Sequence, residues 1–310
     1  MQVYIHAGTY KTGSTAIQQT LFSLRKQLIN QKILYPTSGI SAQAEEIGHR
    51  HSRFVYEYGL KAWDMEVEKL IAEIREHSPD LLVLSSEAWS KPKGTKRMLA
   101  LIDKLRLFDI ERVNVTFVVR NGFDYSVSFF REFVRRWGQR RVYRDYTEKR
   151  IPYYDYNNLF LPFLNEEKFN VKFIPYTENS VTELLADIGL GKFKAQTQRE
   201  VNSSLSTLDI EIQRRINILT KSKAHPSPTA NELFSKIGVE LTRDDIIEDH
   251  PPESLLQLYS TAYQRQFSEL TGLSADVLQI ENSDYFTQSQ AELRVFEPIL
   301  DHLLPLPKKS

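Results

Sequence analysis

The chain has 310 residues, which exceeds the roughly 100–200 residues usual for one domain but is within reach of a single large α/β domain. Its 41% hydrophobic and 26% charged residues exclude a disordered chain, and its 40 basic and 40 acidic side chains cancel, which argues against partners attracted by a global charge, such as nucleic acid or a membrane surface. The absence of cysteine excludes disulfides, thiol catalysis and cysteine-ligated metals.

Two further features concern the cellular compartment. No apolar run approaches the ~20 residues of a membrane-spanning helix. The first predicted strand begins at Gln2, which leaves no room for a signal peptide. We therefore expect a cytoplasmic protein without a membrane span.

The first predicted strand leads into a loop with two glycines, Gly8 and Gly13, and then into a helical pattern that opens with Ser14 and Thr15. This order of strand, glycine loop and helix wraps backbone N–H groups around a phosphate and directs the positive end of a helix at it. Against the triphosphate-binding loop G-x-x-x-x-G-K-[ST], both glycines and Thr15 fit, but Ser14 replaces the lysine. The lysine lies inside the loop instead, as Lys11. An ordinary glycine turn is the alternative interpretation.

Apolar periodicity predicts alternating helices and strands along the rest of the chain. Helical spacing covers residues 17–28, 67–74, 98–105, 210–219 and 255–270. Strands are predicted at 32–36, 81–84, 113–119 and 171–176. The all-apolar runs are typical of parallel strands buried on both faces, so we expect an α/β fold, a parallel sheet flanked by helices.

A polar segment around His49 and His51 precedes the second of these helices. Histidines two residues apart point the same way only on a strand, and no third ligand stands nearby. We therefore expect no metal site here, and predict contact with a substrate or an ordinary surface position.

Polar residues follow two of the buried strands. Glu87 comes just after strand 81–84, at the edge where α/β sheets bind their ligands. It could serve there as a functional carboxylate or simply begin the next turn. After strand 113–119 come Arg120, Asp124 and Ser128; a guanidinium offers a planar fork of donors to a phosphate, and a serine one or two helical turns later adds a hydroxyl.

Together these motifs resemble those of sulfotransferases that use 3′-phosphoadenosine-5′-phosphosulfate (PAPS). Lys11-Thr12-Gly13-Ser14-Thr15 is similar to the family's 5′-phosphosulfate loop. Arg120 and Ser128 resemble its 3′-phosphate ligands. The resemblance implies a P-loop, sulfotransferase-like fold in which Lys11 and residues 12–15 bind PAPS without a metal, leaving 3′-phosphoadenosine-5′-phosphate (PAP) as product.

The resemblance also implies that Glu87 is the catalytic base, since bacterial relatives and heparan N-sulfotransferases have a glutamate on the strand between the two phosphate motifs. Arg199 begins a segment similar to a loop near the 3′-phosphate in bacterial members. The chain departs from the family pattern in that Tyr10 replaces a proline, Ser14 a threonine and Gly122 a proline. The first two changes retain the glycine, the lysine and a hydroxyl.

Two clusters have no assigned role. We expect one helix from 129 to 144 with six arginines, which form either a solvated face or a contact with an acidic acceptor. The tyrosines of a loop at 143–156 could stack on sugars or pack the loop onto the body.

The predicted function is transfer of a sulfuryl group from PAPS to a hydroxyl or amine of an acceptor, expected to be a carbohydrate or glycolipid. A P-loop nucleotide kinase and a non-catalytic PAPS- or PAP-binding protein are the alternatives. We expect one domain over residues 1–310, with a parallel-sheet core in 1–210 and a mainly helical extension in 211–310.

Overall fold

The computed structural model describes residues 1–41, 48–177, 179–191 and 253–278, together with positions 210, 213, 214 and 217. They belong to two compact units. The sheet unit consists of residues 1–121, 155–199 and 261–278, and the second unit consists of residues 122–154, 200–260 and 279–310. The predicted organisation as one domain with a boundary at 210 stays a prediction. The predicted helix at 255–270 corresponds to two helices, α12 (Glu253–Leu258) and α13 (Thr261–Thr271).

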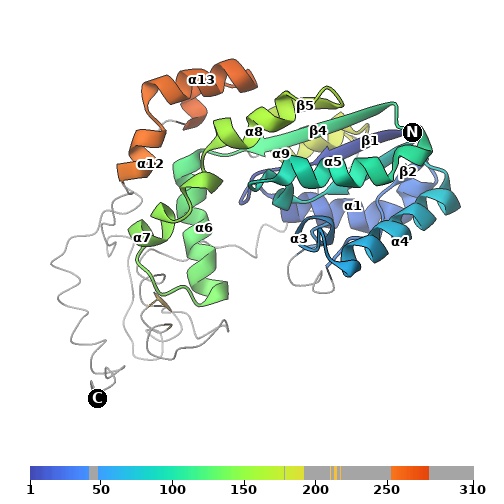
Figure 1. Cartoon of the computed structure of the whole chain (residues 1–310), viewed down its shortest axis with the longest axis horizontal. Helices are drawn as coiled ribbons and strands as arrows, with labels where there is room; N and C mark the ends of the chain where they lie inside the picture. The colour runs from blue at the N-terminus through green and yellow to red at the C-terminus, as the bar shows by residue number, and fades with distance from the viewer. Residues whose placement is uncertain are drawn as a thin grey trace. The chain divides into compact units, whose positions relative to one another are not determined.

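The sheet unit is built on five parallel strands in the order β2-β3-β1-β4-β5 (Figure 1). They are β1 (Gln2–His6), β2 (Ile33–Leu34), β3 (Leu81–Ser85), β4 (Arg112–Val119) and β5 (Phe169–Pro175). The predicted α/β fold with a parallel sheet flanked by helices is confirmed.

The central strands are buried on both faces over most of their length, as their predominantly apolar sequences predict. On one face, Tyr4, Val83 and Val118 pack in a core cluster with residues of α1 (Ser14–Ile29) and α9 (Ser180–Asp187). On the other face, the ring of Phe117 lies 4.8 Å from that of Phe160 on α8 (Tyr156–Leu164). The sheet is therefore covered by helices on both faces.

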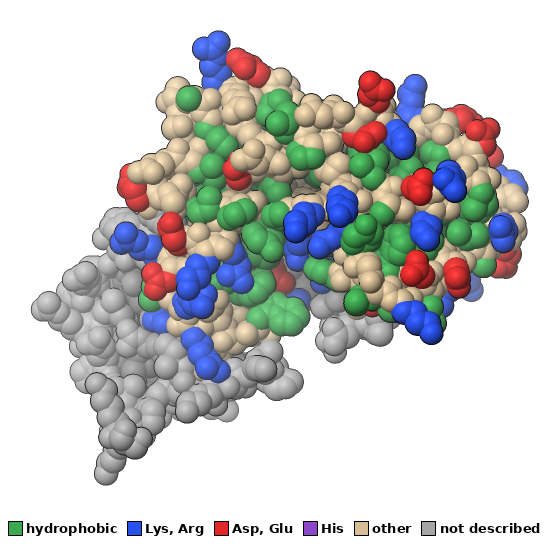
Figure 2. Space-filling view, viewed as in Figure 1, with side chains coloured by type: hydrophobic (Ala, Val, Ile, Leu, Met, Phe, Trp, Pro, Cys, Tyr) green, Lys and Arg blue, Asp and Glu red, His purple; other side chains and the backbone are tan. Residues whose placement is uncertain are grey.

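The remaining elements of the sheet unit either connect these strands or, in the case of α13 and η4 (Ala275–Leu278), follow the last strand. They are α3 (Arg53–Tyr56), α4 (Lys61–His77), α5 (Gly94–Lys104), α13, and the short 3₁₀ helices η1 (Glu87–Ser90), η2 (Arg106–Phe108) and η4. On the face shown in Figure 2, basic and acidic side chains are interspersed over the sheet unit. None of the helices that the structure describes has both the length and the apolar character needed to cross a bilayer.

The second unit contains α6 (Gly122–Trp137), α7 (Tyr143–Glu148), the 3₁₀ helix η3 (Ile151–Tyr153) and α12. The prediction of one arginine helix from 129 to 144 is wrong, because α6 ends at Trp137 and Gly138 follows at φ 62°, a conformation that favours glycine. Arg136 therefore does not share a helical face with Arg140 and Arg144.

The tyrosines that follow also differ from the predicted loop. Tyr143 and Tyr146 lie on α7 and are fully buried, and Tyr154 is buried as well. The guanidinium of Arg150 lies 3.9 Å from the centre of the Tyr146 ring. Packing, the second of the two sequence interpretations, accounts for these rings, because a buried ring has no face left for a sugar.

Candidate functional site

The strand order places the sequence motifs at one point of the sheet. From β1 the chain continues to β2 and β3 on one side, and the later strands β4 and β5 lie on the other side. In open α/β sheets, ligands bind outside the carboxyl ends of the strands where the order reverses in this way. That point lies between β1 and β4, whose carboxyl ends lead to the Lys11 loop and to Arg120.

The loop between β1 and α1 is fixed to the neighbouring strand. The backbone N–H and the hydroxyl of Thr9 both donate to the carbonyl of Val118 on β4, at 2.9 and 3.1 Å. The Thr12 hydroxyl donates to the carbonyl of Thr9 at 2.7 Å. Lys11 and Gly13 have φ values of 67° and 76°, so the loop turns twice through the left-handed region. The backbone is therefore held in one specific, partly strained shape.

The α1 helix begins directly after this loop, at Ser14, and its amino end is not neutralised. No side chain caps it, and its first turn contains no acidic residue. The first N–H groups of a helix have no partner within the helix, and the dipole places positive charge there. Thr12 and Ser14 are buried with hydroxyls 3.4 Å apart, whereas Gly13 and Thr15 are exposed. These features match what an anion requires.

Arg120 connects the two predicted phosphate motifs. Its Nη1 donates to the carbonyl of Lys11 at 3.0 Å, and its guanidinium lies 5.2 Å from the centre of the Tyr176 ring. The hydroxyl of Tyr156 donates to the Arg120 carbonyl at 2.9 Å. The Nε of Arg120 is buried and has no hydrogen-bond partner in the described part of the chain. A buried donor without a partner is costly, so this nitrogen is available for an acceptor atom of a ligand.

Two other predicted ligands lie in the second unit or outside the described residues. Ser128 lies on α6 in the second unit, with a partly exposed side chain. Arg199 lies outside the described residues. Their proposed roles at the 3′-phosphate stay predictions.

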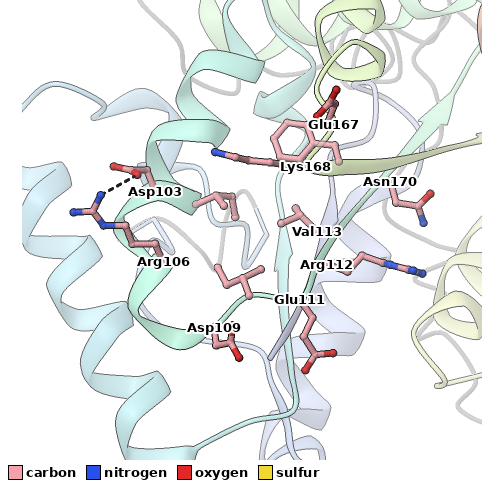
Figure 3. Close-up of a pocket in the computed structure, with 12 residues that line it drawn as sticks. Asp103, Arg106, Asp109, Glu111, Arg112, Val113, Glu167, Lys168 and Asn170 are labelled. Atoms are coloured by element: carbon pink, nitrogen blue, oxygen red, sulfur yellow. Dashed lines mark ion pairs between the residues drawn. The ribbon is translucent and has the colours of Figure 1, made fainter.

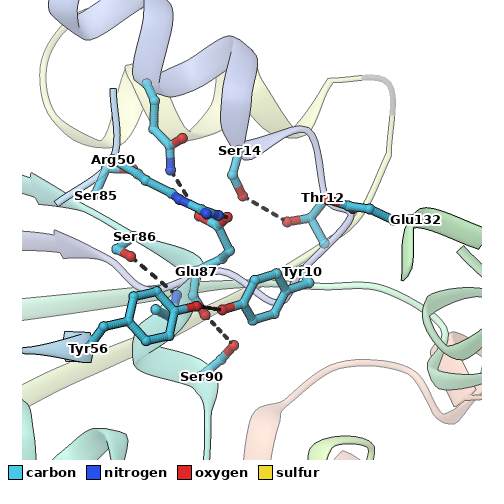
Figure 4. Close-up of polar contacts among 12 residues, drawn as sticks. Tyr10, Thr12, Ser14, Arg50, Tyr56, Ser85, Ser86, Glu87, Ser90 and Glu132 are labelled. Carbon is cyan, nitrogen blue, oxygen red and sulfur yellow. Dashed lines mark hydrogen bonds and ion pairs between the residues drawn. The ribbon is translucent and has the colours of Figure 1, made fainter. Parts of the chain in front are cut away.

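Glu87 is the first residue of η1 and lies two residues after the last residue of β3, the strand next to β1. The cap of η1 is the hydroxyl of Ser86, which accepts from the N–H of Ala88. The Glu87 side chain is turned elsewhere: it accepts from Gln18 Nε2 at 3.0 Å and from Arg50 Nη1 at 2.5 Å (Figure 4). Since Gln18 lies one helical turn after Ser14, the carboxylate stands next to the first turns of α1.

The surroundings of Glu87 keep it ionised. Burial raises the pKa of its carboxyl, but the charge of Arg50 and the hydrogen bonds from Gln18 and Arg50 more than offset this, and the pKa lies below its ordinary value. The carboxylate is therefore in the form that can accept a proton. The same ion pair makes it a weaker base than an unpaired buried carboxylate would be.

His51 has a structural role. His51 is fully buried; its Nδ1 accepts from the N–H of Ser85 at 3.0 Å, and its Nε2 is 3.0 Å from the carbonyl of Pro36. This is a correction to the predicted substrate contact or surface position, and it arises because the ring joins two backbone segments. His49 stacks on Phe22 with ring centres 3.7 Å apart.

His6 lies beneath the Lys11 loop. Its Nδ1 is 2.8 Å from the Ser85 hydroxyl, and a side chain at Gly8 would come within 2.9 Å of its Nε2. Burial lowers its pKa to about 4, although the charge of Glu87 acts in the opposite direction. The ring is therefore neutral near pH 7, and the absence of a side chain at Gly8 is what allows the loop to pass over it.

Sequence reasoning missed Gln18 and Arg50. Gln18 belongs to the helical pattern of α1, and Arg50 stands between two histidines in a segment that the sequence marks only as polar. Both are identified by their contact with Glu87, which no spacing along the chain indicates.

A cavity of about 620 Å³ lies at the opposite edge of the sheet, beside the amino ends of β4 and β5 (Figure 3). Its polar lining is largely exposed and of mixed sign, including an ion pair between Asp103 and Arg106. It has none of the predicted site residues. Nowhere in the described ranges do three or more histidine, aspartate or glutamate side chains come together as metal ligands would.

Comparisons of the chain with protein-family models, with curated proteins and with solved structures gave no match.

Proposed function

We propose that the chain is a PAPS-dependent sulfotransferase that transfers a sulfuryl group to a hydroxyl or amine of a carbohydrate or glycolipid acceptor. The observation that carries the proposal is the hydrogen bond from Arg120 to the Lys11 carbonyl, because it joins two motifs that are 109 residues apart. The joined motifs lie at the carboxyl ends of adjacent strands, where the strand order reverses. PAPS requires two anion sites close together, one for each phosphate-bearing end.

The residues present fit this ligand. The uncapped amino end of α1 and the backbone N–H groups of residues 12–15 would hold the 5′-phosphate. The buried, unpartnered Nε of Arg120 supports contact with the 3′-phosphate, with Ser128 and Arg199 as further proposed ligands. When bound, PAPS would supply the sulfuryl group, and PAP would be its leaving group.

The remaining chemistry belongs to residues of the chain. The Lys11 ammonium would stabilise negative charge on the phosphate oxygen whose bond to sulfur breaks. Glu87 would take the proton from the acceptor hydroxyl or amine as the new bond to sulfur forms. Gln18 and Arg50 would hold the carboxylate in place, since both donate to it. Catalysis would then consist of positioning and charge stabilisation, by analogy with phosphoryl transfer.

Thermal stabilisation by nucleotides tests the proposal. PAP at 100 times its dissociation constant should stabilise the protein by about 2.7 kcal/mol without magnesium, whereas ATP should stabilise it poorly. Arg120→Ala should lose most of this effect. Arg112→Ala is a matched control, because Arg112 is an exposed arginine at the opposite end of β4 and should leave the effect intact.

Other results would favour the alternative functions. Equal or larger stabilisation by ATP, or a strict magnesium requirement, would favour a nucleotide kinase. Stabilisation by PAP without release of PAP from PAPS in the presence of any carbohydrate acceptor would favour a non-catalytic binding protein. Equal loss in Arg120→Ala and Arg112→Ala would remove the site from this edge of the sheet.

A further inference from the structure

The segment directly after Glu87 is strongly basic. Lys91, Lys93, Lys96 and Arg97 lie within seven residues, and residues 88–102 contain no aspartate or glutamate. All four side chains are at least partly exposed. None of the four forms an ion pair with a carboxylate in the described part of the chain. We refer to residues 91–97 as the basic loop.

Helix stability does not account for this charge. Lys93 precedes α5 at φ 67°, without a side-chain cap, and the first turn of α5 has no acidic residue. Cations near the amino end of a helix are unfavourable, because the helix dipole is positive there. A solvated charge run chosen for stability would have the opposite sign at this position.

One lysine of the basic loop is held in a defined place. The Lys91 Nζ donates to the hydroxyl of Tyr56 at 2.7 Å and lies 4.4 Å and 5.2 Å from the ring centres of Tyr56 and Tyr10. The two tyrosine hydroxyls are themselves 2.7 Å apart. An ammonium has three donors, so Lys91 retains donors for a further acceptor. The arrangement places a cation over two aromatic rings.

This surface adjoins the candidate base. Burial lowers the pKa of the Arg50 guanidinium, but Glu87, Tyr10 and Tyr56 lie close enough to raise it above its ordinary value. The two tyrosines therefore lie beside the ion pair of Arg50 and Glu87 (Figure 4). Arg50 and Glu87 neutralise each other, so this pair does not cancel the positive charge of the basic loop. Tyr56 is 49% exposed and offers a flat amphipathic ring of the kind that stacks on sugars.

We infer that the basic loop, with Lys91 as its fixed cation, and the exposed part of Tyr56 form a binding site for an acidic saccharide. An acidic saccharide is a sugar that carries a carboxylate or sulfate group. The ring of Tyr56 would contact the sugar ring, and Lys91 would bind the anionic group. The inference rests on the proposed function for one point only: the bound saccharide is the sulfuryl acceptor. Binding itself requires neither PAPS nor turnover.

Binding of two oligosaccharides, measured by calorimetry without nucleotide, tests the site. A hyaluronan hexasaccharide carries carboxylates, and chitohexaose is a neutral chain of the same length. We expect the wild type to bind the hyaluronan hexasaccharide at least about tenfold more tightly than chitohexaose, because a hydrogen bond to a charged group is worth this much. The affinity for hyaluronan should fall as the salt concentration rises.

Matched variants assign the binding to the basic loop. Lys91→Gln/Lys93→Gln should weaken hyaluronan binding by about tenfold or more and leave chitohexaose unchanged. Lys168→Gln makes the same charge change at the opposite edge of the sheet and should have no effect. If the loss of the Lys91 contacts unfolds the chain, Lys93→Gln/Lys96→Gln changes only exposed side chains and should still weaken hyaluronan binding.

Three results would overturn the inference: equal affinity for the two saccharides, an equal effect of Lys168→Gln, or tighter binding of a dT6 oligonucleotide than of hyaluronan. Failure of PAP to bind would contradict the proposed function but leave the saccharide measurement valid. The two proposals can therefore fail separately.

Discussion

Replacing Arg50 with methionine would leave the Glu87 carboxylate buried without its counter-charge. The two side chains are 17% and 10% exposed, and the distance between Nη1 and Oε1 is 2.5 Å. Removing one partner of a buried ion pair costs about 3–5 kcal/mol. Because some solvent reaches this pair and Gln18 still donates to Glu87, we expect Arg50→Met to lower the free energy of unfolding by about 3 kcal/mol at pH 7.

The pH dependence of this cost follows from the sign of each pKa shift. In the wild type, the pKa of Glu87 lies below its ordinary value of 4.5, so its contribution to stability is present above pH 4.5 and is lost as the pH falls through the lower folded value. In Arg50→Met, burial becomes dominant and raises the pKa above 4.5. As the pH falls, protonation of Glu87 then removes the unpaired buried charge from the variant. The difference in the free energy of unfolding between the wild type and Arg50→Met should therefore shrink from pH 7 to pH 4.5.

Urea unfolding followed by tryptophan fluorescence at several pH values measures this difference. Arg106→Met is the control, because Arg106 and Asp103 form an exposed pair at 3.7 Å whose loss should cost below about 1 kcal/mol at any pH. Arg50→Met/Glu87→Gln removes both charges and should recover part of the lost stability. A difference that stays constant or grows as the pH falls would refute the reasoning.

Three further predictions concern single positions. Arg120→Ala should weaken PAP binding by about 1.5–3 kcal/mol, and Ser128→Ala should weaken it by less. Adenosine 5′-phosphosulfate lacks the 3′-phosphate, so calorimetry should show that it binds the wild type and Arg120→Ala alike. Equal weakening of both ligands by Arg120→Ala would contradict the assignment of Arg120 to the 3′-phosphate. Glu87→Gln should retain PAP binding but lower turnover by roughly 10²–10⁴, and near wild-type turnover would remove Glu87 as the base. Gly122→Ala should destabilise the second unit by about 1–3 kcal/mol in thermal unfolding, because the new Cβ would lie 1.7 Å from the Tyr259 hydroxyl oxygen. Adding Tyr259→Ala to this variant should relieve the clash. If Gly122→Ala alone costs no stability, the contact between Gly122 and Tyr259 is absent.

The sheet could be predicted from the sequence because its central strands are buried on both faces. Short runs of mainly apolar residues suit that environment, so β3 and β4 stand out from the amphipathic helices around them. The residues at the carboxyl ends of these strands could be selected for the same reason, since a parallel sheet brings such ends to one edge. The contact between Arg120 and the Lys11 loop follows from that geometry.

The partners of Glu87 could not be predicted in the same way. Gln18 and Arg50 reach the carboxylate from a helix and from an irregular segment, 69 and 37 residues away in sequence. Their contact with Glu87 depends on tertiary packing, which the apolar periodicity of the sequence does not indicate. The prediction of one arginine-rich helix from 129 to 144 was wrong for a local reason. Gly138, which has the left-handed conformation, follows the last residue of α6.

Gly122 stands where the sulfotransferase motif that the sequence resembles has a proline, and the structure gives a physical reason for a glycine here. A side chain at Gly122 would collide with the ring of Tyr259, whose hydroxyl donates to the carbonyl of Tyr154. The contact with Tyr259, the residue that follows α12, therefore accounts for the glycine at this position.

A crystal structure of the protein with PAP bound tests the proposed site most directly. The 5′-phosphate should lie within hydrogen-bonding distance of the N–H groups of residues 12–15, and the 3′-phosphate should lie against the guanidinium of Arg120. PAP bound in the reverse orientation, or at another edge of the sheet, would contradict the proposed site.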